Sequence, residues 1–341
     1  MYRFLTLLII TFSINTSSRS YIDYESPYHP VVGKSGMVVS QNYLSSDIGI
    51  EILNLGGNAV DAAVAVGFSL AITLPRAGNL GGGGFMLVYI KEKNEIFYID
   101  YRSKSPLNSN LENIFNIKDD SGKNYETVPK NFDSKKYDLV DTGYKASAVP
   151  GTVAGLLEAH SRFGKLKLKD ILEPVIKQAK QGIVVSYDLS KAIESTPRLA
   201  NDPESKKIYF DNDTPIQQYS LLKLPDLANT LTLISKHGRD GFYKGETAKK
   251  IVEAMQKNNG LMSLNDFSDY KAYIKKPIST EYRGNKVYTA GPPSGGGITL
   301  LTALNILSYF DLAKYKSNSV MTYHLFSEAL RRGHNNRSSE V

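Results

Sequence analysis

The chain has 341 residues, of which 41% are hydrophobic and 22% are charged, a composition typical of a globular protein with a substantial core. Its formal net charge is +7, but lysines and glutamates are interspersed, so the sequence lacks the basic stripe with interleaved aromatic residues that is typical of nucleic-acid binding. Cysteine is absent, which excludes disulfides, thiolate nucleophiles and Cys-based metal sites, and the five histidines do not show zinc-ligand spacing.

The N-terminus has the three parts of a secretory signal peptide. Arg3 provides a basic start, residues 4–14 are mainly apolar, and residues 15–20 offer small side chains for cleavage. The apolar run is shorter than the ~20 residues that cross a bilayer. We therefore expect residues 1–20 to direct a secreted or periplasmic protein and residues 21–35 to form a lead-in segment. The alternatives are a buried first strand or an uncleaved membrane anchor.

The first predicted elements follow from hydrophobic periodicity. Residues 37–39 are expected to form a short strand and residues 40–55 a helix. Asn58 is placed to cap a second helix, residues 59–73, and Asp61 favours the first turn of that helix. Alanine, valine and glycine occur on nearly all sides of this helix, which predicts that it is buried at the centre of the protein.

A glycine run, Gly81–Gly84, leads directly into an apolar strand expected at residues 85–90. The run is not a P-loop, because no Gly-Lys-Ser/Thr follows, and it is not a dinucleotide-binding fingerprint, because it precedes a strand. Four glycines allow positive φ and close approach to a neighbouring chain or ligand. A tight helix-to-strand connection is the simpler interpretation. A hairpin turn then leads to a second strand, residues 95–102.

The remainder alternates predicted helices with short strands. Residues 107–140 are polar and expected to be irregular, and residues 187–220 show no readable pattern. Ser263 and Asp266 form a capping box for a short helix. Further helices are expected at residues 150–163, 168–181, 224–237, 246–258, 298–309 and 319–332, and further strands at 278–282 and 286–289. This mixture predicts a layered α/β protein.

Arg102 is the candidate binding residue. It ends a strand of apolar and aromatic residues, so a rigid element would hold its guanidinium, whose planar fork suits bidentate recognition of a carboxylate. An arginine paired with Asp100 or another acid for structural reasons fits the sequence equally well. Gly-x-Ser-x-Gly does not occur, and Ser294, within Pro-Pro-Ser-Gly-Gly-Gly, is better explained by a turn than as a nucleophile.

Several blocks, taken in order, resemble the large subunit of the γ-glutamyltranspeptidase family. They run from about residue 36 to residue 338 and comprise GGNAVDAA at 56–63, GNLGGGGFM at 78–86, Tyr101-Arg102, AVPG at 148–151, GFYKG at 241–245, YRG at 282–284, PPSGG at 292–296, Glu328-Ala329 and Arg337-Ser338. One glycine-rich loop would be a weak signal, whereas ordered blocks at family-like spacing are a strong one.

The resemblance implies an N-terminal-nucleophile hydrolase fold, an αββα sandwich of two stacked sheets between helical layers. In that family a proenzyme cleaves itself and frees a threonine at the start of the small subunit. This threonine attacks the γ-glutamyl amide of glutathione and related compounds, with its own α-amine as the base, and the acyl-enzyme passes to water or to an acceptor amino acid or peptide. The resemblance implies no metal and no organic cofactor.

Residue by residue, Arg102 falls on the family arginine that binds the α-carboxylate of the glutamyl group. Ser103 follows it where the family commonly has glutamate, so the local support of the arginine is expected to differ. Gly81–Gly84 align with the buried glycine run near the family's active site, and we assign them a structural role.

The family's Thr-Thr-His motif does not occur in these 341 residues. We therefore expect residues 36–341 to be a truncated large-subunit domain, with an incomplete αββα core and no catalytic residue of its own, whose partner is the small subunit of the same precursor. Three functions stay open. The first is a γ-glutamyltransferase or glutathione hydrolase whose fragment is inactive alone. The second is a non-catalytic secreted remnant or binding protein, and the third is a same-fold acylase or poly-γ-glutamate transpeptidase.

Overall fold

The computed structural model describes residues 31–110 and 142–340 and consists of two units, residues 1–37 and 38–341. The expected signal peptide and most of the lead-in and of the polar segment at 107–140 lie outside the described residues. The strand expected at residues 37–39 is wrong, because these residues pair with no other strand among those described.

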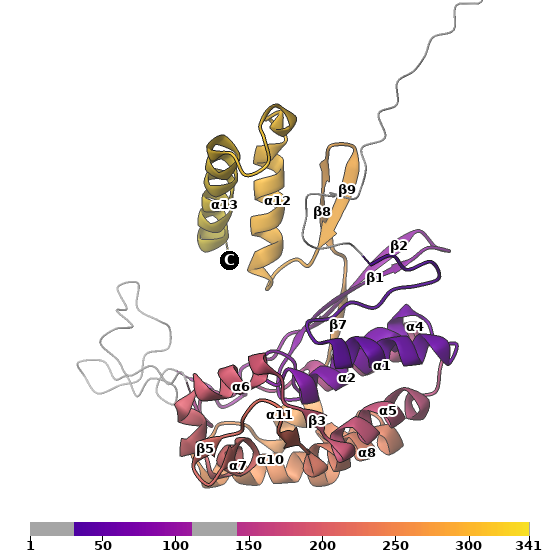
Figure 1. The fold of residues 1–341 in the computed structure, drawn as a ribbon, viewed down its shortest axis with the longest axis vertical. Helices are drawn as coiled ribbons and strands as arrows, with labels where there is room; N and C mark the ends of the chain where they lie inside the picture. The colour runs from indigo at the N-terminus through magenta and orange to yellow at the C-terminus, as the bar shows by residue number, and fades with distance from the viewer. Residues whose placement is uncertain (1–30, 111–141, 341) are drawn as a thin grey trace, which may run out of the picture. The chain divides into compact units, whose positions relative to one another are not determined.

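Helix α2, Ala59–Thr73, is the central helix that the sequence predicts. It begins in a capping box: the Asn58 side chain accepts the N–H groups of Val60 and Asp61, and the Asp61 carboxylate accepts the N–H of Asn58. Eleven of its residues are buried, and the less buried Ala59, Ala63, Gly67 and Leu70 share one side of the helix. It packs against α1, Tyr43–Asn54, which Asn42 caps (Figure 1).

The main sheet has three antiparallel strands in the order β1-β2-β7 (Figure 1). Strand β1 is Gly84–Ile90, β2 is Glu95–Tyr101, and β7 is Tyr273–Lys275. The sequence predicted β1 and β2 but not β7, which has only three residues and lies far from them along the chain. Its register places Tyr273 opposite Asp100 in the central strand.

The two faces of this sheet have different surroundings. Val88 and Ile99 are buried on the face that packs against helix α4, Thr152–Phe163, and belong to the core of the unit. On the opposite face of β1, Leu87 is 42% exposed and Tyr89 is 57% exposed. One face therefore packs against the core, whereas the other exposes Leu87 and Tyr89 beside the buried Tyr98 and Asp100.

Further helices form a layer on the other side of α2. Helix α5, Leu168–Gln181, packs between α2 and α8, Pro225–His237. Along the chain come α9 (Asp240–Tyr243), α10 (Gly245–Lys257) and α11 (Leu264–Asp269), the last in the capping box of Ser263 and Asp266. Residues 187–220, for which the sequence showed no pattern, form α6 (Tyr187–Glu194), η2 (Pro197–Asn201), α7 (Pro203–Tyr209) and the strand pair of β4 (Phe210–Asp211) and β5 (Thr214–Pro215). The strands on either side of this stretch, β3 (Ile183–Val184) and β6 (Leu221–Leu222), pair with each other.

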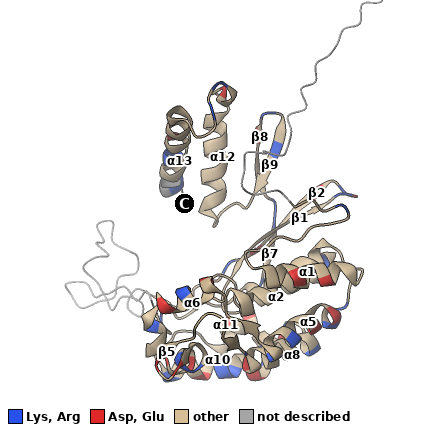
Figure 2. Cartoon of the chain, viewed as in Figure 1, with Lys and Arg blue, Asp and Glu red and all other residues tan. Residues whose placement is uncertain are grey.

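The C-terminal elements are a hairpin and a helix pair. Strands β8, Ile278–Tyr282, and β9, Asn285–Thr289, form the hairpin. Helix α12, Gly295–Leu307, packs against α13, Val320–Glu340, and η3, Leu312–Lys314, lies between them along the chain. Figure 2 shows charges of both signs on α5, α8 and α10, whereas α12 carries none.

Within the described ranges, none of the helices combines the length and the hydrophobicity that crossing a membrane requires.

Candidate functional site

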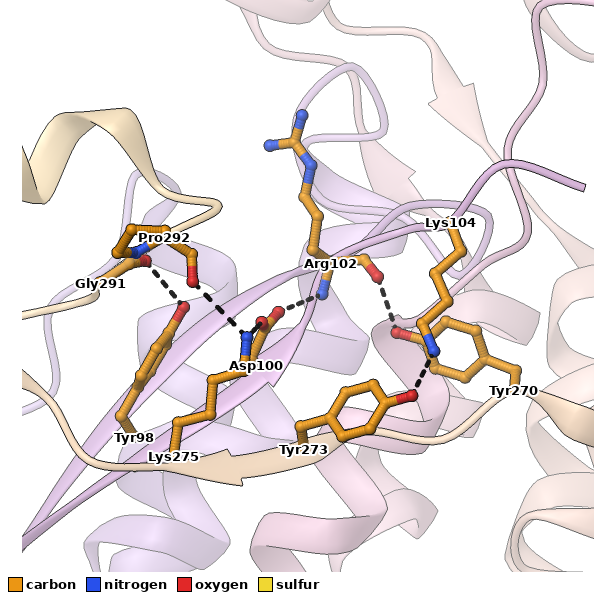
Figure 3. Close-up of polar contacts among 9 residues, drawn as sticks. All are labelled: Tyr98, Asp100, Arg102, Lys104, Tyr270, Tyr273, Lys275, Gly291 and Pro292. Carbon is orange, nitrogen blue, oxygen red and sulfur yellow. Dashed lines mark hydrogen bonds and ion pairs between the residues drawn. The ribbon is translucent and has the colours of Figure 1, made fainter. Parts of the chain in front are cut away.

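Arg102 lies directly after the last residue of the central strand β2 and is exposed. Its side chain extends away from the polar residues that surround its main chain (Figure 3). Among the described residues, the guanidinium forms no ion pair and no hydrogen bond, although the main-chain N–H and carbonyl oxygen of Arg102 each form one. The structure thus holds the main chain of Arg102 and leaves the donors of its guanidinium available.

Asp100 does not pair with the Arg102 side chain, which was one of the two sequence interpretations. Its carboxylate instead accepts a hydrogen bond of 2.6 Å from Lys275 Nζ on the neighbouring strand β7. The other carboxylate oxygen accepts the main-chain N–H of Arg102 at 3.1 Å. Asp100 is almost completely buried, so its charge is balanced by Lys275 and not by Arg102.

Tyr270, immediately after α11, holds the carbonyl side of the Arg102 main chain. Its hydroxyl donates a hydrogen bond of 2.9 Å to the carbonyl oxygen of Arg102. The ring stacks on that of Tyr243, with centroids 5.7 Å apart and an angle of 6° between the planes. Because burial disfavours a charged phenolate, the pKa of Tyr270 is raised above its ordinary value, and its hydroxyl stays a donor at neutral pH.

Four glycines from two segments make room for Tyr101, the residue before Arg102. A Cβ atom on Gly155 of α4 would overlap the Tyr101 ring, and one on Gly84 would lie 2.9 Å from the same ring. A Cβ on Gly83 would lie 2.7 Å from the Tyr101 carbonyl oxygen, and one on Gly151 would overlap that oxygen. The glycines therefore let β1, β2 and α4 approach closely, which agrees with the structural role assigned to the glycine run.

The glycine run also accepts hydrogen bonds at the N-terminus of helix α4. The carbonyl oxygen of Gly82 accepts the N–H groups of Gly151 at 2.7 Å and of Thr152 at 3.1 Å, so it takes up donors that the first turn leaves free. The Tyr243 hydroxyl donates to the Pro150 carbonyl oxygen at 2.8 Å. The run is thus joined to the segment that supports Tyr101 and Arg102.

Lys104, two residues after Arg102, is held apart from it. Its ammonium donates a hydrogen bond of 2.7 Å to the Tyr273 hydroxyl and lies 4.3 Å from the centre of the Tyr273 ring. That hydrogen bond lowers the pKa of Tyr273. Figure 3 shows the Lys104 and Arg102 side chains leaving the chain in different directions.

A groove of about 940 Å³ lies between α8 and α10 and is bordered by Leu80, Gly81 and the segment around Ala148. Arg102 does not line it. Ser294, the nucleophile that the sequence analysis set aside, closes a turn in which its N–H donates to the Gly291 carbonyl oxygen at 3.0 Å, and α12 begins after it. The preference for a turn at this position is confirmed.

The sequence named Arg102 as the candidate residue but gave no signal for Tyr270, which bonds the Arg102 main chain, or for Lys275, which bonds Asp100. Tyr270 is 168 positions from Arg102 along the chain, and Lys275 is 175 positions from Asp100. The one local signal near them is the capping box of α11, which places a helix end just before Tyr270 but says nothing about its contacts.

Comparison with known proteins identifies relatives over almost the whole chain. The family model described as Gamma-glutamyltranspeptidase matches residues 45–341. The glutathione hydrolase proenzyme of Escherichia coli (strain K12) is 40% identical over 321 residues, which cover 94% of this chain and 53% of that protein. The Acylase ACY 1 proenzyme of Pseudomonas sp. (strain SE83) is 34% identical over 310 residues, which cover 91% of this chain and 54% of that one.

A solved structure agrees with these relatives. The crystal structure of Helicobacter pylori γ-glutamyltranspeptidase matches with a TM-score of 0.81 and 35% identity, over 91% of this chain and 85% of that chain. The mixed α/β fold is therefore that of the N-terminal-nucleophile hydrolases, as expected. The chain spans about half the length of the curated relatives that it matches. On both sequence and structure, it belongs to the γ-glutamyltranspeptidase family.

Proposed function

We propose that this chain supplies the carboxylate-binding part of a γ-glutamyltransferase or glutathione hydrolase. The observation that carries the proposal is the Arg102 guanidinium, which has no partner among the described residues although its main chain is held on both sides. Such a group can form two parallel charge-assisted hydrogen bonds with the α-carboxylate of a γ-glutamyl donor. The donor would be glutathione or another γ-glutamyl compound.

In the proposed reaction, Arg102 binds and orients the donor and takes no part in bond breaking. A threonine hydroxyl from the part of the relatives' length that this chain does not cover attacks the γ-amide carbonyl. The C–N bond breaks, the amine leaves with a proton, and an ester to the threonine remains. Water then gives glutamate, or the amino group of an acceptor amino acid or peptide gives a new γ-glutamyl amide.

The open face of the main sheet supports a partner subunit. Leu87 and Tyr89 expose much of their apolar surface there, while the other face is buried against α4. Sheets that expose large apolar side chains on one face gain stability when a second layer covers that face. We propose that the small subunit of the same precursor provides this layer.

We also propose export. Residues 1–20 have the composition of a signal peptide, and the family's substrates are small polar compounds that an exported enzyme can reach. Sequencing the N-terminus of the protein recovered outside the cytoplasm would test this, because the mature chain should start near residue 21. A mature protein that begins at Met1 would contradict the proposal.

The function is tested by fusing this chain to the part of the E. coli glutathione hydrolase proenzyme that its match leaves uncovered. We expect the fusion, once shown by gel filtration and circular dichroism to be folded, to release glutamate from glutathione. This chain alone should show no turnover. A folded fusion without γ-glutamyl activity would favour the alternative of a non-catalytic protein.

The similarity to an acylase proenzyme makes a same-fold acylase the second candidate. Two amide substrates distinguish the candidates: a γ-glutamyl anilide, which carries an α-carboxylate and an α-amine, and a glutaryl anilide, which lacks the amine and keeps the carboxylate. A γ-glutamyl enzyme should prefer the first by at least ten-fold in kcat/KM. A reversed preference would assign acylase activity.

A further inference from the structure

We propose that Tyr270 is a positioning residue for Arg102, which holds the Arg102 carbonyl group and thereby sets the direction in which the guanidinium meets the donor. The inference rests on the proposed function of Arg102. It concerns a residue from a different segment of the chain, which no sequence pattern connects to the site.

The peptide groups on both sides of the Arg102 Cα atom are fixed by side chains. On one side, Asp100 Oδ1 accepts the Arg102 N–H at 3.1 Å, and Asp100 is itself held by Lys275 at 2.6 Å. On the other side, the Tyr270 hydroxyl donates to the Arg102 carbonyl oxygen at 2.9 Å (Figure 3). Because φ and ψ are the two soft angles of a residue, holding both peptide groups also fixes the direction of the Cα–Cβ bond.

Tyr270 is rigid enough to serve as this support. It is 2% exposed, and its ring is stacked on Tyr243. The Arg239 guanidinium donates hydrogen bonds to the main-chain carbonyl oxygens of Phe267, Ser268 and Tyr270, so the main chain of Tyr270 is also restrained. A Cβ on Gly151 would overlap the Tyr270 hydroxyl, so the absence of a side chain at residue 151 is what allows this hydroxyl to reach Arg102.

Loss of the Tyr270 hydroxyl should therefore act on donor binding and not on bond breaking. Without it, the peptide plane after Arg102 can rotate, and the guanidinium samples directions in which it cannot form two parallel hydrogen bonds with a carboxylate. The variant Tyr270→Phe removes the donor and keeps the ring that stacks on Tyr243. Tyr273→Phe is the matched control, since it removes a hydroxyl three residues away that bonds Lys104 instead.

The kinetic test uses the folded fusion described above, with Tyr270→Phe, Tyr273→Phe, Arg102→Ala and the double variant Tyr270→Phe/Arg102→Ala. We expect Tyr270→Phe to raise KM for a γ-glutamyl anilide about 2- to 12-fold with kcat nearly unchanged. This range is the change in affinity that corresponds to the loss of one neutral hydrogen bond. Tyr273→Phe should match the wild type. The effect should disappear with a donor that lacks the α-carboxylate and in the Arg102→Ala background.

A second measurement does not depend on turnover. Hydrogen–deuterium exchange of the full chain should show faster exchange in the peptide around Arg102 for Tyr270→Phe than for Tyr273→Phe, by about 2- to 12-fold. Equal exchange in the two variants would overturn the inference, as would a KM change that persists without Arg102. If Arg102→Ala itself leaves KM unchanged while the exchange difference is seen, the proposed function has failed and the positioning contact stands.

Discussion

Asp100 and Lys275 form an ion pair of 2.6 Å between the neighbouring strands β2 and β7. The sequence left open whether Arg102 pairs with Asp100 or binds a ligand. This ion pair excludes the pairing, because Asp100 is bonded to Lys275 instead. Asp100 is already neutralised by a lysine that is distant along the chain, so the arginine carries an excess positive charge at the strand end.

Substitution of Arg102 should weaken donor binding in the active fusion. We expect Arg102→Ala to raise KM for the γ-glutamyl donor by about 10- to 100-fold, because a hydrogen-bonded charge pair contributes about 1.5–3 kcal/mol. Arg102→Lys should recover only part of the loss, since a lysine cannot form the two parallel bonds. Arg76→Ala is the control, as Arg76 is an exposed arginine already paired with Asp188. Equal KM values for the two alanine variants would remove Arg102 from the site.

The open sheet face should control assembly with the small subunit proposed above. Leu87→Asp is expected to change the melting temperature of the isolated chain by no more than a few degrees, because Leu87 is already largely in solvent. The same change should abolish association in the fusion, measured as loss of compact folding on gel filtration. Val184→Asp, at a comparably exposed apolar residue of β3, is the control. Normal assembly of the Leu87 variant would argue against a second layer on this face.

Gly155 should tolerate no side chain. Gly155→Ala places a Cβ into the Tyr101 ring, and we expect a loss of about 3 kcal/mol or more in unfolding free energy. Gly296→Ala is the matched helical control: its Cβ would meet only Ser294 Oγ at 3.9 Å, so the helix propensity of alanine should leave stability equal or slightly higher. Urea denaturation of both variants measures the difference. Similar midpoints would show that the Tyr101 pocket can relax.

The buried carboxylate of Asp61 should matter more for stability than a typical helix cap. It accepts the N–H groups of Asn58, Lys165 and Leu166. Asp61→Ala leaves these donors unpaired, which should cost about 3 kcal/mol or more. Asp170→Ala removes an exposed aspartate from the first turn of α5 and should cost less than about 1 kcal/mol. Chemical denaturation that gave the same loss for both would contradict the role of burial.

Local chemistry predicts much of this fold. Asn58 with Asp61, and Ser263 with Asp266, mark helix starts because a capping box is complete within four residues, and the structure confirms both. A continuous apolar run predicts β1, and alternation predicts β2, and both are also local signals. These signals need no knowledge of distant contacts, and therefore the boundaries agree within a few residues.

Contacts between distant segments could not be predicted. Strand β7 has three residues, too few for an alternating pattern, and exists because β2 offers it a free edge. The bond from Tyr270 to Arg102 likewise depends on how α11 ends beside the sheet. The expected strand at residues 37–39 shows the opposite error: its apolar residues fit a strand, but no neighbour completes a ladder.

High pH should destabilise the protein through its buried tyrosines. Burial raises the pKa of Tyr101 to about 12 from an ordinary value of 10.0. The folded state thus favours the neutral phenol. The contribution of Tyr101 to the free energy of unfolding is fully present below pH 10 and is lost as pH rises toward 12. Between these values, Tyr101→Phe should reduce the slope of unfolding free energy by about 1.4 kcal/mol per pH unit. Tyr309→Phe, at a fully exposed ring, serves as the control, and an unchanged slope in the Tyr101 variant would contradict the assignment.

The space around Tyr101 has a consequence for sequence divergence. The ring occupies the volume that a side chain at residue 155 would need, so these two positions share one fixed volume. A smaller residue at 101 should permit alanine or serine at 155, and a bulky residue at both should not occur. Covariation of the two positions among related chains would record this exchange, and it can be sought without any assay.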